Sequence, residues 1–318
     1  MTMLIDWHSH HTPPEIIQTF VEITGKRPRS FNDNDSPDFS RRIRDMDEAG
    51  VDIQLVCQGS TVAADQLSGT LAMAIAGRTN DLIAERIAPF SGRLLGVIAV
   101  SLGCPEESMR EIERMAAKGF CAVQLYPRVD TDAMLDDPGL EPLFAKISEL
   151  GLPVFLHGSS FSSRSPRIND PTLKRLEDGG VGVLYSAIAD AEVSECAVRL
   201  IASGLFDRCP DLQIVIRSAG GGLPMILNRL FWKHKGPNGE KKYSEIFLEH
   251  FLVDTAGLNT RGLQFLLDTL GEDRVVFGSD YCGGPGPVKR ALPAIEGHPN
   301  PNHLRRLLER NARRLLGL

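Results

Sequence analysis

The chain has 318 residues, of which 42% are hydrophobic and 24% charged, a balance typical of a folded protein with a sizeable core. Its net charge of −6 argues against nucleic acid or an anionic membrane as the main partner, because both bind basic faces, and favours a small-molecule substrate. We find no signal-peptide pattern and no uncharged apolar run of the ~18 residues that a membrane helix needs. The six cysteines have no C-x-x-C spacing, which indicates reduced thiols and a cytoplasmic location.

Short apolar runs alternate with longer segments of helical spacing along the whole chain. Strands are expected at residues 4–8, 51–57, 94–100, 120–125, 152–156, 212–216, 251–254 and 274–277. Helices are expected at 39–49, 66–88, 105–118, 140–150, 194–204, 223–232, 261–270, 287–295 and 303–316. Apolar runs without polar alternation, each followed by a helix, are typical of parallel strands buried on both faces. Eight such units predict a (β/α)8 barrel of the TIM type in a single domain, 1–318; a doubly wound open sheet is the alternative.

Two connections are longer than a barrel needs, at 11–38 and 158–193. They follow the first and fifth predicted strands, so in a barrel they emerge on the carboxyl-terminal face, where such enzymes place their chemistry. Both are candidate lids or substrate-binding loops, and disordered surface insertions are the alternative. No linker rich in Pro, Gly or Ser divides the chain into two domains.

Four side chains that can bind a metal stand at predicted strand ends. His8 and His10 follow the first strand, and the two-residue period of a strand puts both imidazoles on one side. His157 follows the fifth strand and Asp280 the eighth. At one barrel mouth, three imidazoles and a carboxylate suit Zn²⁺, Mn²⁺ or Fe²⁺ with a position open for water or substrate. The alternatives are solvated or core histidines and a turn aspartate. Asp254, after the seventh strand, could orient a ligand histidine or cap a helix.

Motifs over nearly the whole chain resemble one family of enzymes. They are found at residues 5–10, 46–52, 153–157, 210–212, 220–224, 273–281 and 310–317. The sequence is similar to the amidohydrolase-related metal enzymes of the aminocarboxymuconate-semialdehyde decarboxylase type, in the amidohydrolase superfamily. The resemblance implies a distorted (β/α)8 barrel with one divalent ion, usually zinc and in some members manganese. By position, His8, His10 and His157 would be ligands, and Asp280 would be a ligand or a metal-adjacent acid and base. A homodimer is also expected, because dimers are common in the family.

One position departs from the family pattern. The sixth strand of the family usually ends in a histidine that is thought to activate metal-bound water or contact substrate, but here that residue is Ser218. A serine hydroxyl forms hydrogen bonds but is not a base near neutral pH. Either Asp280 or His11 takes the role, or the chemistry differs, or the protein is an inactive relative that keeps a metal.

Members of the family mostly decarboxylate aromatic or unsaturated acids, while others hydrolyse lactones or carbon–carbon bonds or hydrate double bonds. We therefore predict a non-oxidative decarboxylase of a small carboxylic acid. A hydrolase of lactone, amide or carbon–carbon bonds, or a non-catalytic metal-binding relative, is the alternative. An anionic substrate needs cationic partners, and arginine contacts carboxylates through two hydrogen bonds. The predicted substrate-binding residues are Ser218, Arg164, Arg167, Arg217 and Arg229, the last at a position where the family carries an arginine.

Overall fold

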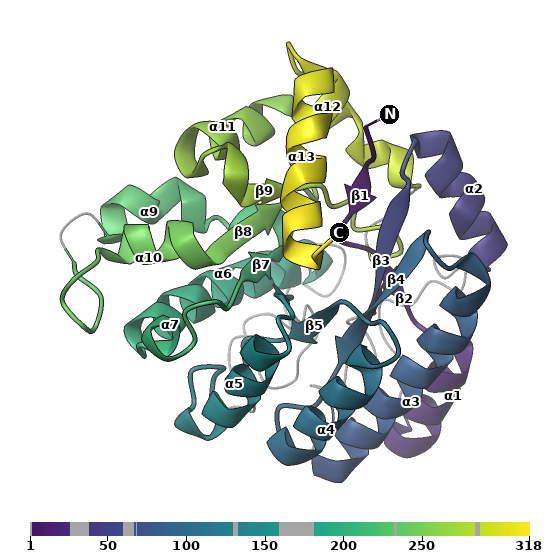
Figure 1. Cartoon of the computed structure of the whole chain (residues 1–318). Coiled ribbons are helices and arrows are strands. Elements are labelled where there is room, and N and C mark those ends of the chain that lie inside the picture. The colour runs from purple at the N-terminus through teal and green to yellow at the C-terminus, as the bar shows by residue number, and fades with distance from the viewer. Residues whose placement is uncertain are drawn as a thin grey trace.

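The computed structural model describes residues 2–25, 38–59, 67, 69–129, 133–158, 181–231, 234–283 and 287–318, with the side chains of 181–185 and 228–231 left out. At its centre lies one parallel sheet with the strand order β1-β3-β4-β5-β6-β7-β8-β9, and β2 also pairs with β3 (Figure 1). The strands are β1 (Ile5–Asp6), β2 (His10–His11), β3 (Ile53–Gln58), β4 (Leu94–Ala99), β5 (Ala122–Leu125), β6 (Val154–Leu156), β7 (Ile214–Ile216), β8 (Phe251–Asp254) and β9 (Val275–Val276).

The eight predicted strand positions are all confirmed, with one refinement at the first. β1 and β2 both pair in parallel with β3, so they are two halves of one strand that is interrupted at residues 7–9. The sheet closes between its two ends. The Trp7 amide donates to the Phe277 carbonyl at 2.8 Å, and the Asp280 amide donates to the His8 carbonyl at 2.9 Å. This closure confirms the barrel and excludes the open sheet.

Helices surround the strands (Figure 1). They are α1 (Pro14–Thr24), α2 (Phe39–Ala49), α3 (Gly69–Ile87), α4 (Pro105–Ala116), α5 (Glu141–Glu149), α6 (Val181–Ala202), α7 (Leu205–Arg208), α8 (Arg217–Gly220), α9 (Leu223–Phe231), α10 (Tyr243–His250), α11 (Thr260–Leu270), α12 (Pro293–Glu296) and α13 (Pro301–Leu316). Short 3-10 helices lie at η3 (Ala88–Phe90), η4 (Pro138–Leu140), η6 (Glu272–Arg274) and η7 (Val288–Ala291). No helix in the described ranges is both long and apolar enough to cross a membrane.

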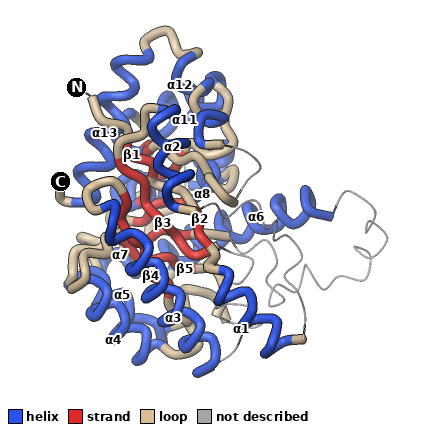
Figure 2. The backbone as a smooth tube through the Cα atoms, turned by 90° about the vertical axis from the view of Figure 1, so that its right-hand side faces the viewer, coloured by secondary structure: helices blue, strands red, loops and turns tan. Residues whose placement is uncertain are grey.

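The helix predictions missed the short helices α7 and α8 and were wrong at four further places. The first long connection contains α1, which begins at a proline, buries Ile16, Ile17 and Phe20 on one face and ends at Gly25 in the left-handed conformation. Figure 2 shows α1 beside α3, which it contacts. In the second long connection, α6 begins 13 residues before the expected start at 194. α10 was not predicted, and η7 with α12 replaces the single helix expected at 287–295. Residues 26–37 and 159–180 of the two connections lie outside the described residues.

The core has two main parts, because the strands are buried on both faces. Inside the barrel, side chains such as Trp7, Leu55, Val97 and Phe155 pack against one another. Between strands and helices lies a larger cluster. All six residues of β3 are buried, as expected for a parallel strand covered on both sides. The rigid ring that results holds the strand ends, and the side chains that follow them, in fixed positions.

Candidate metal centre

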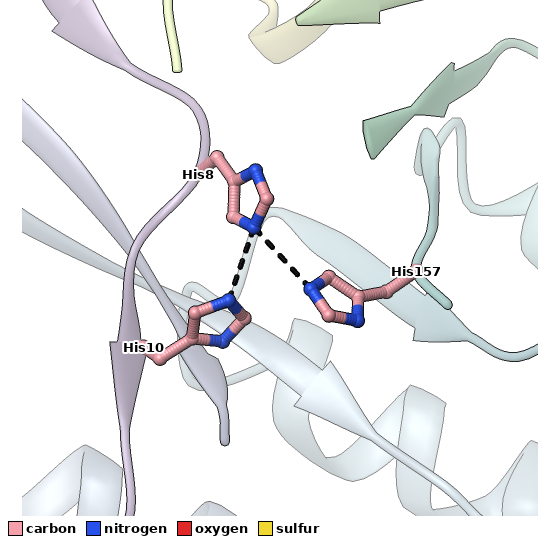
Figure 3. Close-up of side chains that lie close together, drawn as sticks. All are labelled: His8, His10 and His157. Carbon is pink, nitrogen blue, oxygen red and sulfur yellow. Dashed lines mark hydrogen bonds between the residues drawn. The ribbon is translucent and has the colours of Figure 1, made fainter. Parts of the chain in front are cut away.

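Three histidines meet at the carboxyl-terminal mouth of the barrel (Figure 3). The Nε2 atom of His8 lies 3.0 Å from Nε2 of His10 and 3.3 Å from Nε2 of His157. One ligand atom from each ring lies within 4.8 Å of the other two, and all three side chains are buried. His8 and His10 come from the interrupted first strand and His157 directly follows β6, so neighbours in space are 149 residues apart in sequence.

Asp280 completes this cluster from the other side of the barrel closure. Its Oδ1 atom lies 3.2 Å from Nε2 of His8 and 3.2 Å from Nε2 of His10. Asp280 has a φ of 55°, a left-handed conformation that is uncommon outside glycine and often marks a functional position. Its side chain is 31% exposed, whereas the His8 side chain is fully buried, so the carboxylate forms the open edge of the cluster.

Two glycines, Gly278 and Gly283, allow the chain on either side of Asp280 to approach the cluster closely. A Cβ atom at Gly283 would lie 2.1 Å from the Asp280 carboxylate and 2.4 Å from the His10 ring. At Gly278, a Cβ atom would lie 2.9 Å from the Cβ atoms of both His8 and Asp254. Residues 278–283 can therefore fold over the histidines only with glycine at these two positions.

The charges around the cluster favour a cation. Burial lowers the pKa of His8, but Asp254 and Asp280 outweigh it and raise that pKa to about 10. Burial lowers the pKa of His10, and burial with the nearby Arg217 charge holds the pKa of His157 well below its usual range. Burial raises the pKa of Asp280, but His8 and His10 hold it well below its usual range. Near neutral pH the metal-free cluster thus combines a protonated His8, neutral His10 and His157 and an ionised Asp280, and a bound cation would take the place of the His8 proton.

The outer ring nitrogens show which lone pairs are free for a ligand. Nδ1 of His8 lies 2.6 Å from the Asp254 carboxylate, and Nδ1 of His10 lies 3.2 Å from the Gln58 carbonyl oxygen. Both acceptors require a proton on Nδ1, so Nε2 is the atom that each ring can offer to a metal, in His8 once its second proton is released. For His157 no such partner is found among the described residues. Three imidazole nitrogens and one carboxylate oxygen suit Zn²⁺ or Mn²⁺, so the residues fit a single divalent ion.

Asp254 contacts a histidine of the cluster, which is the first of the two functions that the sequence left open. Its Oδ2 atom contacts Nδ1 of His8, while Oδ1 accepts from the amides of Ser218 at 2.8 Å and Ala256 at 3.0 Å. Asp254 therefore orients a histidine of the cluster and at the same time holds the turn that follows β7.

We expect Asp254→Asn to weaken metal binding about 10- to 100-fold, the usual effect of losing a partner of a ligand histidine. The asparagine oxygen can still accept from the two backbone amides, whereas its amino group would face the protonated Nδ1 of His8. Titration of the metal-free protein with Mn²⁺ and Zn²⁺ measures the change. The exposed Asp268, on α11, serves as control through Asp268→Asn. Equal metal affinity in wild type and Asp254→Asn would show that this contact does not orient His8.

Ser218 and Arg217 lie at the carboxyl end of β7. Ser218 has a φ of 48°, and its hydroxyl accepts a hydrogen bond from Nε of Arg217 at 3.0 Å. The guanidinium also donates to the Gly158 carbonyl at 3.4 Å and lies 3.3 Å from an Asp190 carboxylate oxygen. Arg217 is thus held beside the segment that carries His157. Asp190, on α6, was not among the predicted residues, since no spacing links it to a strand end; burial raises its pKa.

Ser218→Ala is expected to leave metal affinity unchanged, because the hydroxyl contacts Arg217 and not the histidines. The Ser218 amide, which holds Asp254, is retained in the variant. The same metal titration, compared with Asp254→Asn, tests this expectation. Loss of metal from Ser218→Ala would mean that the site is misplaced.

Of the remaining predicted residues, only His11 has a described side chain, and it is not brought to the cluster. The His11 side chain lies on the opposite side of the strand from His10, and its ring packs against Phe39 with centroids 4.8 Å apart. Burial and the charges of Arg42 and Arg86 lower the pKa of His11 to about 2. This position gives no support to its predicted catalytic role. Arg164 and Arg167 lie outside the described residues, and Arg229 lies in α9 with its side chain outside them.

A closed parallel barrel with these donors at the strand ends defines a metal-binding barrel enzyme. A family model described as amidohydrolase matches residues 5–318, so the chain belongs to the amidohydrolase family, as its motifs predicted. Gamma-resorcylate decarboxylase of Rhodococcus jostii (strain RHA1) is 30% identical over 257 residues, 76% of each chain. The 2-amino-3-carboxymuconate-6-semialdehyde decarboxylase of Dictyostelium discoideum is 27% identical over 283 residues, 85% of this chain and 73% of that one.

Two solved structures that resemble this chain are also decarboxylases. The 5-carboxyvanillate decarboxylase LigW from Sphingomonas paucimobilis matches with a TM-score of 0.86 and 25% identity, over 100% of both chains. A dihydroxybenzoic acid decarboxylase from Polaromonas sp. JS666 matches with a TM-score of 0.80 and 25% identity, over 100% of this chain and 98% of that one. The latter structure holds manganese and the inhibitor 2-nitroresorcinol.

Proposed function

We propose that this protein is a metal-dependent decarboxylase that releases CO2 from a small aromatic or unsaturated carboxylic acid. The observation that carries the proposal is the meeting of His8, His10, His157 and Asp280 at the barrel mouth. The relatives support the reaction class, because four similar proteins from bacteria and an amoeba are named as decarboxylases of such acids.

One divalent ion is the proposed cofactor, with the three histidines as ligands and Asp280 at its open side. The sequence favoured Zn²⁺ over Mn²⁺. The manganese in the Polaromonas structure supports Mn²⁺ as an equal candidate, while the three imidazoles suit either ion. When bound, the ion supplies Lewis-acid chemistry, withdrawing electrons from substrate oxygens and stabilising negative charge.

The protein's own residues then bind the acid and move a proton. The bond between the substrate carbon and its carboxylate breaks, CO2 leaves, and the electron pair stays on the carbon, which takes up a proton. Asp280 is ionised in the folded protein, so it must first receive that proton from the substrate or from water. Arg217, held by Asp190, is the proposed partner for an anionic group of the substrate. Ser218 can orient Arg217 or substrate but cannot act as the base.

Several predictions from the sequence stay predictions. They are the contacts of Arg164, Arg167 and Arg229 with substrate, the single domain spanning 1–318, the homodimer and the cytoplasmic location. Light scattering of the purified protein gives the oligomeric state, since a dimer has twice the mass of one chain.

The test of the proposed function is metal-dependent release of CO2. Purified protein is stripped of metal, reconstituted with Mn²⁺ or Zn²⁺, and incubated with hydroxybenzoic acids and muconate-type acids. We expect CO2 in equal amount to the acid consumed for at least one substrate, and none without metal. A product that gains water without CO2 would indicate hydrolysis or hydration instead. Binding of less than about half an equivalent of metal per chain would count against any metal-dependent reaction.

A further inference from the structure

Arg42, on α2, is a fully buried cation with no acidic partner among the described residues. Its side chain has 0% exposure, and no carboxylate of the described residues lies within ion-pairing distance of it. The neighbouring Arg41 is 55% exposed and pairs with Asp45 at 3.8 Å. An arginine that is buried without a counter-ion carries a large desolvation penalty, so its other contacts must compensate for it.

Those contacts hold the strand that carries the histidines. Nη1 of Arg42 donates to the Ser9 hydroxyl at 2.9 Å and to the Gln54 side-chain oxygen at 2.6 Å. Nη2 donates to the carbonyl oxygen of His10. Ser9 and His10 directly follow His8, at the place where the first strand is interrupted between β1 and β2. Arg42 thus satisfies a backbone carbonyl and a side-chain hydroxyl in the segment that carries both imidazoles.

The same guanidinium also contacts the segment that carries Asp280. It lies 4.9 Å from the centre of the Tyr281 ring and 5.2 Å from that of Phe39, both within the range of cation–π contacts. The Tyr281 hydroxyl donates to Asp45 at 2.6 Å, which ties this segment to α2 a second time.

A polar chain extends from Arg42 behind the cluster. The Gln54 amide donates to Oδ2 of Asp6 at 2.7 Å. Asp6 in turn accepts from the His8 amide at 3.2 Å, the Ser279 amide at 2.9 Å and the Ser279 hydroxyl at 2.6 Å. His8 and Asp280 are therefore joined from behind through neutral and charged groups that are all buried or partly buried. A buried network of hydrogen bonds of this kind favours a single arrangement of the side chains that it connects.

We propose that Arg42 is a positioning residue of the metal centre, which sets His8, His10 and Asp280 at the spacing one divalent ion requires. The inference rests on the proposed function, because it assumes that these residues bind a metal. Arg42 touches no ring or carboxylate of the cluster and acts through the backbone of His10 and through Gln54.

Metal affinity of the stripped protein tests the role of Arg42 without any measurement of activity. Competition of Mn²⁺ and of Zn²⁺ with a chelating dye is measured for wild type, Arg42→Met, Arg42→Lys and the matched control Arg41→Met. Arg42→Met is expected to bind either ion about 10- to 100-fold more weakly, as for other groups that orient ligands. Arg42→Lys should be intermediate, because an ammonium group is a point charge that cannot serve three acceptors in fixed directions. Arg41→Met should match wild type.

Thermal unfolding of the metal-free proteins separates positioning from a purely structural role. A purely structural role predicts a lower unfolding temperature for Arg42→Met with unchanged metal affinity, and that outcome would overturn the proposal. Absorption spectra of the Co²⁺-substituted proteins add a second readout, since altered ligand directions shift the Co²⁺ bands of Arg42→Lys but not those of Arg41→Met. If Arg42→Met does not fold, the test rests on Arg42→Lys. A metal affinity and a Co²⁺ spectrum equal to those of wild type in Arg42→Lys would then refute the inference. If wild type itself binds neither ion, the proposed function fails as well.

Discussion

Replacing His157 with alanine is expected to abolish metal binding and CO2 release together. The change removes one of three nitrogen donors, and His157 is the only one of them that comes from outside the first strand. The two remaining imidazoles lie on one segment, and with Asp280 they leave no donor on the side of the cluster that β6 supplies. The metal affinity should therefore fall by more than the roughly 10- to 100-fold that follows from removing the hydrogen-bond partner of a ligand histidine. Metal content after dialysis and decarboxylase activity are both measured.

The control for this variant is another buried histidine. Nδ1 of His250 donates to the Leu212 carbonyl at 3.0 Å, and the His250 ring stacks on Phe206, so its contacts are remote from the cluster. His250→Ala should lower stability through lost packing but keep one equivalent of metal. A His157→Ala protein that retains a full equivalent would show that the three histidines are not the ligand set.

Asp280→Asn is expected to reduce kcat about 100- to 10,000-fold, the range for loss of a general acid–base group. Asparagine has nearly the same shape and keeps an oxygen near His8 and His10, but it neither carries the charge nor accepts a proton from substrate or water. Because Asp280 could also be a ligand, kcat is measured at saturating Mn²⁺ and the metal affinity is measured separately.

The two results together assign the role of Asp280. A large fall in kcat with nearly unchanged metal affinity indicates proton transfer, while a fall in affinity that excess metal restores indicates a ligand. Asp268→Asn, at an exposed position, should behave as wild type in both. Wild-type kcat in the metal-saturated Asp280→Asn protein would remove Asp280 from the mechanism.

Local patterns along the chain were sufficient for the framework. The eight strand positions follow from apolar runs, because parallel strands buried on both faces need such runs wherever they occur. The pairing of His8 with His10 follows from the two-residue period of a strand. The same local reasoning missed α1, although a proline start, a glycine end and three apolar residues on one face indicated it.

Contacts between distant segments decided the site itself. His8 meets Asp254 across 246 residues, and strand alternation turns His11 towards Phe39 while its neighbour His10 enters the cluster. The buried Arg42 and the Asp190 partner of Arg217 could not be found from spacing, because each acts on a residue of another element. The alternation of strands and helices, the family and the four candidate ligands follow from the sequence, because all of them are properties of short segments. The hydrogen-bond partners that orient these ligands are visible in the folded barrel alone, because they depend on how the barrel closes.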